Sequence, residues 1–66
     1  MLFRYADKLH NGDEVDVRKS ATGKTCAVGG KVIKTYINPE QPKVIRLDVI
    51  LHTGEYLAGL THRDLV

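Results

Sequence analysis

The segment 43–52 constrains the fold of this 66-residue chain more than any other part of the sequence. Apolar residues recur there at every second position, and charged or polar residues mostly stand between them. The apolar residues that share this period are Ile45, Leu47, Val49 and Leu51. Such a period is typical of a half-buried β-strand, because successive strand side chains point to opposite faces. The spacing predicts a strand over 43–52 with these side chains in the interior of a sheet.

The segments on either side of this strand predict antiparallel neighbours. Gly54 can adopt the positive φ of a tight turn, which predicts a hairpin between 43–52 and a strand over 55–60. The β-branched segment 31–37 predicts a preceding strand, and the Pro-containing loop 38–42 would connect it to 43–52.

Residues 12–18 predict a turn that leads into a short strand, with Val15 and Val17 facing inward. The segment 19–30 contains three glycines and few bulky apolar residues, so we expect a long flexible loop. Near the end of the chain, Thr61 and the carboxylate of Asp64 have the spacing of a helix-capping box.

This spacing predicts a single 3₁₀ turn, followed by a last short strand at 65–66. The order of elements resembles the SH3-like small-barrel superfamily in its broad sense, and the segments that carry the resemblance are 12–18, 30–33, 53–54 and 61–66. The resemblance implies a mainly β fold, with one five-stranded SH3-like barrel domain over residues 1–66 and the single 3₁₀ turn near the C-terminus. Residues 1–11 lie outside the matching segments and are expected to form an N-terminal extension or an edge segment.

Proteins of this superfamily have unrelated functions, so the fold does not select one. They include ribosomal and transcription-factor modules, Tudor domains, a photosystem I subunit of this size and the plasmid-encoded trimethoprim-resistant dihydrofolate reductase. The resemblance therefore leaves open a binding module, a small oligomeric enzyme of the reductase type and an accessory subunit of a larger complex. The reductase family places a Val-Gln-Ile-Tyr segment at its central pore, whereas this chain has Leu-Ala-Gly-Leu at 57–60.

The length and the single cysteine limit how the domain is stabilised. A chain this short closes one core and is only marginally stable, and Cys26 has no second cysteine with which to form a disulfide. A lone thiol suits a reducing compartment. The first residues carry charges that a signal peptide would lack, and the longest apolar run is 49–51. We therefore expect a cytoplasmic protein that makes no membrane contact.

The charge of the chain is concentrated in its middle. The formal net charge is +2, but residues 17–47 contain seven basic residues against the single acid Glu40. Clustered bases could contact nucleic acid or a protein partner if the fold places them on one side. The predicted function is thus a small non-catalytic binding module, and the predicted binding residues are Arg18, Lys19, Lys24, Lys31, Lys34, Lys43 and Arg46.

No motif predicts a catalytic residue, a metal ligand or a cofactor. The tripeptide 23–25 imitates the end of a phosphate-binding P-loop, but Arg18 stands where that motif needs glycine. The acids near residue 14 fit a turn and an exposed strand face. The three histidines, His10, His52 and His62, are too scattered for a zinc site. Nothing near Cys26 would build a nucleophilic centre.

Aromatic residues and surplus apolar residues leave two further hypotheses. The four aromatic residues could form a cage for methylated lysine, although packing explains them more simply: they are Phe3, Tyr5, Tyr36 and Tyr56. Only Tyr36 lies within the basic segment, which leaves few rings for stacking on bases. In a regular strand over 31–37, Val32 and Tyr36 would share a face, and Val44 and Ile50 would point away from the core. Such exposed apolar surface favours a homo-oligomer.

Overall fold

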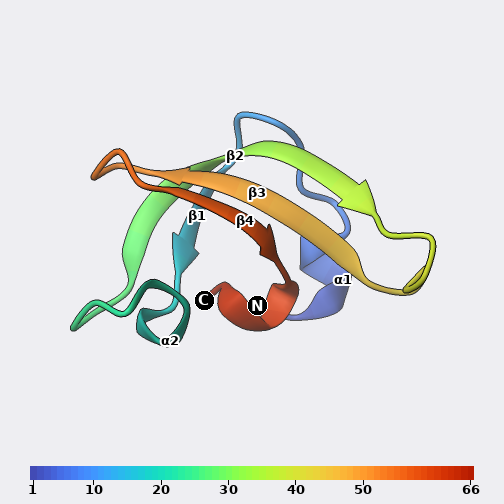
Figure 1. Cartoon of the computed structure of the whole chain (residues 1–66), viewed down its shortest axis with the longest axis horizontal. Coiled ribbons are helices and arrows are strands. Elements are labelled where there is room, and N and C mark those ends of the chain that lie inside the picture. The colour runs from blue at the N-terminus through green and yellow to red at the C-terminus, as the bar shows by residue number, and fades with distance from the viewer.

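The computed structural model describes all residues from 1 to 66 and shows a mainly β protein whose sheet arches over three short helices (Figure 1). The sheet is antiparallel throughout, with its strands in chain order. The strands are β1 (Glu14–Val17), β2 (Val28–Ile37), β3 (Ile45–Leu51) and β4 (Tyr56–Leu60). The helices are α1 (Phe3–Ala6), α2 (Lys19–Thr22) and the 3₁₀ turn η1 (His62–Asp64). No helix has the length and apolar character needed to cross a membrane.

Strand β3 supplies the centre of the core, as its alternating sequence predicts. Leu47, Val49 and Leu51 are buried on the concave face, whereas Ile45 is only half-buried at the end of the strand. The rest of the buried apolar cluster comes from the other strands and the C-terminal tail: Val15, Val17, Val32, Leu60 and Leu65. The predicted inward orientation of Val15 and Val17 is confirmed.

A β-bulge in β2 reverses the alternation that the sequence predicts. The register with β3 shifts between Val32 and Lys34, so Ile33 is an extra residue on β2. Val32 pairs with Val49 on the concave face, whereas Tyr36 pairs with Arg46 and lies on the convex face. The prediction that Val32 and Tyr36 share a face is therefore wrong, because one inserted residue moves all later side chains to the other face.

The segment 19–30 is more ordered than a flexible loop. It contains α2, which ends at Gly23 with a φ of +73°, and β2 begins three residues earlier than predicted, at Val28. Gly29 and Gly30 thus lie inside β2 rather than before it. The β3 backbone approaches Gly30 so closely that only glycine fits there, since a Cβ at this position would lie 2.6 Å from the Ile50 carbonyl oxygen.

The capping box at the C-terminus is confirmed. The Thr61 hydroxyl accepts a hydrogen bond from the Arg63 N–H (3.3 Å), and the Asp64 carboxylate accepts one from the Thr61 N–H (2.9 Å). The tail beyond η1 pairs with β1 only through an isolated bridge between Leu65 and Val17. The structure therefore shows four strands in an unclosed sheet where five strands and a barrel were predicted, because only Leu65 aligns with β1 as a bridge.

Residues 1–9 pack beneath the sheet beside the C-terminal tail, and the chain then rises to the top of the arch before it enters β1 (Figure 1). Helix α1 buries Ala6 to 1% exposure, and Met1 and Leu9 pack against the apolar core. The Met1 nitrogen donates a hydrogen bond to the carbonyl of Leu65. This segment therefore covers one side of the core under the arch (Figure 1).

We expect Gly30→Ala to destabilise the domain more than Gly29→Ala. The added methyl at Gly30 would meet the β3 backbone and the Val49 side chain at 2.6–3.1 Å, which costs about 1–3 kcal/mol in overpacking. At Gly29 the nearest atoms, at 3.0–3.4 Å, belong to the side chains of His52 and Asp16, which can move aside. Urea denaturation of both variants tests this difference, and equal losses of stability would contradict it.

Candidate functional site

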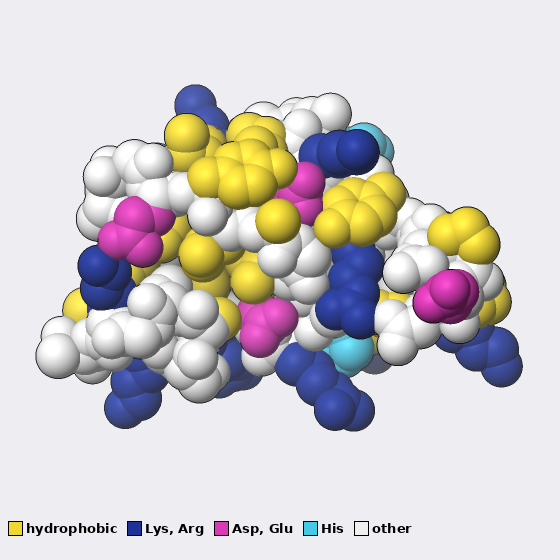
Figure 2. All heavy atoms as spheres, viewed as in Figure 1, with side chains coloured by type: hydrophobic (Ala, Val, Ile, Leu, Met, Phe, Trp, Pro, Cys, Tyr) yellow, Lys and Arg dark blue, Asp and Glu magenta, His cyan; other side chains and the backbone are white.

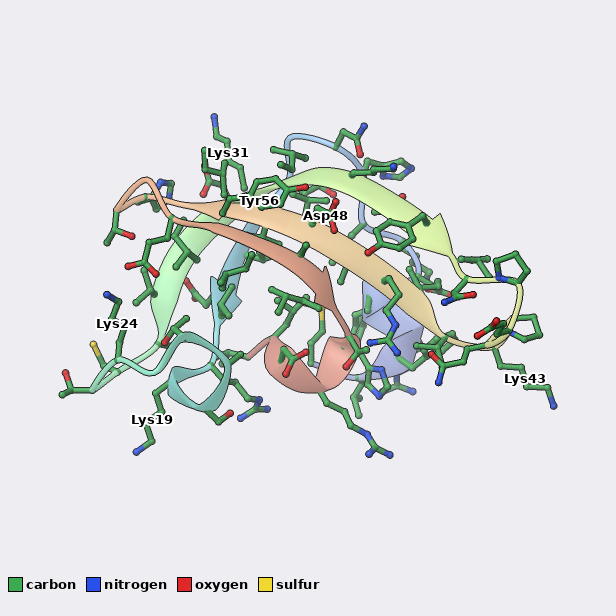
Figure 3. The ribbon with its side chains drawn as sticks, viewed as in Figure 1. Lys19, Lys24, Lys31, Lys43, Asp48 and Tyr56 are labelled. Carbon is green, nitrogen blue, oxygen red and sulfur yellow. The ribbon has the colours of Figure 1, made fainter.

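The convex face of the sheet carries two tyrosines on either side of an acidic residue. Tyr36 comes from β2, Asp48 from β3 and Tyr56 from β4, and we refer to these residues as the Tyr–Asp–Tyr cluster. Figure 3 shows Asp48 and Tyr56 together on the upper surface of the arch. Hydrophobic, acidic and basic side chains interleave over this part of the surface (Figure 2).

Two β-bulges meet at Asp48. The β2 bulge lies beside it, and the register between β3 and β4 also shifts between Leu47 and Val49. On β4 the irregularity includes Gly59, whose φ of +71° suits glycine. The chain therefore departs from regular pairing on both sides of Asp48, and bulges of this kind commonly re-aim side chains.

Asp48 is the only buried charged residue of the fold, at 7% exposure. One carboxylate oxygen accepts a hydrogen bond from the Tyr56 hydroxyl (2.7 Å), and the other accepts one from the Gly59 N–H (3.0 Å). A buried carboxylate is costly unless it is hydrogen-bonded, so these contacts make its position tolerable. They also fix the Tyr56 hydroxyl against the sheet.

The charge of Asp48 shifts the pKa values across the cluster. The hydrogen bond from Tyr56 lowers the pKa of Asp48 below its ordinary value, and the Gly59 N–H adds to this effect against the opposing effect of burial. The same hydrogen bond raises the pKa of Tyr56. Burial, followed by the Asp48 charge, raises the pKa of Tyr36. At neutral pH the cluster is thus one carboxylate between two protonated phenols.

Two basic side chains lie beside the cluster. The Lys34 ammonium is 5.3 Å from the centroid of the Tyr36 ring, within the range of a cation–π contact. The Arg46 guanidinium donates hydrogen bonds to the Gly59 carbonyl (3.1 Å) and to the Gln41 side chain (2.6 Å). Arg46 is therefore held in place next to the cluster.

The structure brings together only Lys34 and Arg46 of the predicted binding residues around the cluster. Lys31 also points outward from the top of the arch, but Lys19, Lys24 and Lys43 project from other parts of the molecule (Figure 3). Two other predicted binding residues have partners away from the cluster: Lys24 pairs with Glu55 (2.7 Å), and Arg18 donates a hydrogen bond to the Leu65 carbonyl (3.1 Å). The basic residues of the middle segment are thus spread over several faces.

Sequence reasoning missed Asp48 and Tyr56 as partners in a site. Asp48 alternates with the apolar residues of its strand, which predicts only that its side chain points away from them, and Tyr56 lies outside the basic segment. The glycine at 59 inside a predicted strand was the one local signal, because such a glycine often marks a bulge. Nothing in the residue spacing places Tyr56 next to Asp48.

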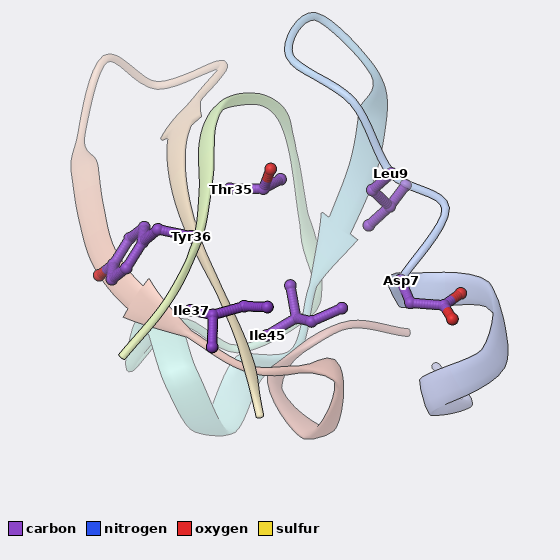
Figure 4. Close-up of a pocket in the computed structure, with 6 residues that line it drawn as sticks. All are labelled: Asp7, Leu9, Thr35, Tyr36, Ile37 and Ile45. Carbon is purple, nitrogen blue, oxygen red and sulfur yellow. The ribbon is translucent and has the colours of Figure 1, made fainter. Parts of the chain in front are cut away.

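A second feature is an open, mostly apolar cleft at the far end of β2. Its volume is about 350 Å³, and the N-terminal segment forms one wall while the ends of β2 and β3 form the other (Figure 4). The residues that line it are Asp7, Leu9, Thr35, Tyr36, Ile37 and Ile45. We call this feature the β2-end cleft.

We expect Asp48→Asn to flatten the pH dependence of stability. The folded pKa of Asp48 is lowered, so its contribution is present above the ordinary value of 3.8 and is lost as pH falls through the lower folded pKa. The free energy of unfolding of the native chain should therefore fall between about pH 5 and pH 2 more steeply than that of Asp48→Asn.

At neutral pH, Asp48→Asn should also lose about 1–3 kcal/mol, because the amide offers one acceptor oxygen to the two donors Tyr56 and Gly59. Urea denaturation over this pH range measures both effects. Asp7→Asn, at an exposed aspartate, is the matched control and should behave as the native chain does. Identical pH profiles of the two variants would contradict the role of Asp48 in the cluster.

Comparison with known proteins adds no family to this geometry. The chain matches no protein-family model, no curated protein and no solved structure.

Proposed function

We propose that this domain is a non-catalytic binding module that holds single-stranded nucleic acid on the convex face of its sheet. The observation that carries the proposal is the arrangement of two tyrosine rings and two basic side chains around Asp48 on adjacent strands. Aromatic rings on an exposed sheet face, flanked by cations, are a common platform for unstacked bases.

The tyrosines would serve as stacking platforms. Tyr56 is 56% exposed, and its hydroxyl is fixed by Asp48, so its ring loses less conformational freedom when a base stacks on it. Tyr36 is half-buried, and the Lys34 ammonium already lies within cation–π range of its ring. Every base has a π-face, so such stacking is tolerant of sequence.

The cations beside the rings would contact the phosphates. Lys34 and Arg46 flank the cluster, and Lys31 lies further along β2 on the same face, opposite Ile50. The Asp48 charge is buried and hydrogen-bonded, and the Lys34 charge partly offsets it. Since phosphate contacts release counterions, the affinity should fall as salt rises.

A single strand suits this face better than a duplex. The face is the outside of an arched sheet, and no long helix or ribbon projects from it to enter a groove. Flexible single-stranded chains can follow a curved surface and present unpaired bases to it. Both DNA and RNA single strands fit this description.

The proposal is compatible with a small SH3-like barrel, a fold that carries many binding modules. Two backbone hydrogen bonds flank the Val17–Leu65 bridge, from Arg18 N–H to Asp64 and from Val66 N–H to Asp16. We infer that this pairing of the tail with β1 is the counterpart of the last strand of such a barrel.

Binding of a fluorescent single-stranded oligonucleotide of mixed sequence, followed by anisotropy, tests the proposal. At about 50 mM salt we expect saturable binding to DNA or RNA that weakens several-fold at about 200 mM salt. Replacement of either cluster tyrosine by leucine should weaken binding roughly 5-fold to 150-fold, as expected for loss of about 1–3 kcal/mol of stacking.

Tyr5→Leu is the matched control, because Tyr5 is 54% exposed but lies on α1, away from the cluster. It should leave the affinity unchanged. Absence of binding at low salt would refute the nucleic-acid proposal and leave a protein partner. An equal loss from Tyr5→Leu and Tyr56→Leu would refute the convex face as the binding surface.

A further inference from the structure

We propose that two copies of this chain associate through the free edge of β2, with the Ile37 side chain of each copy seated in the β2-end cleft of the other. This inference goes beyond the proposed nucleic-acid function and does not depend on it. It rests on the backbone pairing of β2, the exposure of its last residues and the shape of the cleft.

Half of β2 lacks a neighbour on one side. Strand β1 pairs only with residues from Val28 to Lys31, and Val32 then exchanges backbone hydrogen bonds with the turn residues Gly12 and Asp13. Beyond this point only β3 accompanies β2. Four residues along this uncovered part are exposed: Ile33, Lys34, Thr35 and Ile37.

The register identifies the backbone groups that are unpaired. Val32 faces Val49 and directs its own N–H and C=O away from β3, toward Gly12 and Asp13. Thr35 faces Leu47, which is two residues from Val49, so Thr35 occupies the same kind of pair. Ile37 follows two residues later. Thr35 and Ile37 therefore direct their N–H and C=O groups to the open side, and neither makes a backbone bond outside the strand ladder.

This edge is complementary to itself. When two copies run antiparallel about a two-fold axis at Tyr36, Thr35 of one copy faces Ile37 of the other, and the reverse pair forms by symmetry. Each pair can exchange both of its backbone hydrogen bonds. The same residues thus supply both sides of the contact, as an isologous dimer requires.

In this register the Ile37 side chain of the second copy would enter the β2-end cleft. Thr35 and Ile37 line the cleft from β2, and Leu9 faces them from the N-terminal segment (Figure 4). Ile37 of the second copy would lie beside Thr35 on this same side of the sheet, since directly paired residues share a face. The pairing would bury Ile37, which is 55% exposed in the single chain.

The charges along the free edge of β2 are compatible with this register. Lys34 is the only charged residue between 33 and 37, and it would face the uncharged Asn38 of the second copy, so no like charges oppose each other.

The other two edges of the sheet are less suited to pairing. The β1 edge is short and is covered by the Leu65 tail, and β4 is interrupted by its bulge. Short or bulged edges resist pairing. Beyond its own bulge at Ile33, β2 pairs regularly with β3 from Lys34 to Ile37, and this uncovered regular stretch invites pairing.

Sedimentation equilibrium without nucleic acid tests the dimer. Over a concentration series that reaches the millimolar range, the mass should rise from 7.4 kDa toward twice that value. Thr35→Pro should remain monomeric, because proline removes an N–H that faces solvent in the single chain and is tolerated at such a position. Thr25→Pro, in the exposed loop before β2, should dimerise as the native chain does. A native chain that stays monomeric at the highest concentration would overturn the proposal.

Disulfide trapping tests the register even if Thr35→Pro fails to fold. In a Cys26→Ser background, Tyr36→Cys places two thiols opposite each other at the two-fold axis, where Cα atoms of a non-hydrogen-bonded pair lie about 4.5 Å apart, within disulfide range. Mild oxidation should give a covalent dimer. Tyr56→Cys in the same background is the matched control on the same face and should remain monomeric. Equal cross-linking of the two variants would overturn the proposed pairing.

Discussion

The Asp48 carboxylate holds together the irregular part of the sheet. Regular pairing is interrupted on both neighbouring strands at this position, and the Gly59 N–H bonds to the carboxylate instead of to a ladder carbonyl. The Tyr56 hydroxyl donates a hydrogen bond to the other carboxylate oxygen. The carboxylate thereby accepts a backbone hydrogen bond that a neighbouring strand would otherwise accept. These hydrogen bonds allow it to be buried without an ion-pair partner within salt-bridge distance.

The two bulges also determine what the convex face displays. The extra residue in β2 turns Tyr36 outward, and the pairing of Tyr56 with Ile50 keeps Tyr56 on the same side as Asp48. Without the β2 bulge, Tyr36 would point into the concave side and the basic residue Lys34 would move away from Asp48. The proposed nucleic-acid surface and the proposed two-fold axis at Tyr36 both depend on this one insertion. In the dimer, the convex faces of the two copies would form one continuous surface.

The sequence was sufficient to predict the parts of the fold that local chemistry determines. Period two in β3 identified three of the buried core residues, and the spacing of Thr61 and Asp64 identified the capping box of η1. The site was harder to predict, because a bulge has no reliable local signature and it inverts every later side chain. The buried state of Asp48 depends on Gly59 and Tyr56, which are distant in sequence and approach it only through the β3–β4 hairpin. Composition locates the basic residues in the middle of the chain, but it could not show that their side chains project from different faces.

The most direct test of this account is a pH titration of the Gly59 amide and the Asp48 carboxyl carbon by NMR. We expect both signals to titrate together, with an apparent pKa below the ordinary aspartate value of 3.8, because the amide donates to the charged carboxylate. A Gly59 amide signal that does not follow Asp48, or an Asp48 pKa at or above the ordinary value, would contradict the central role of this carboxylate.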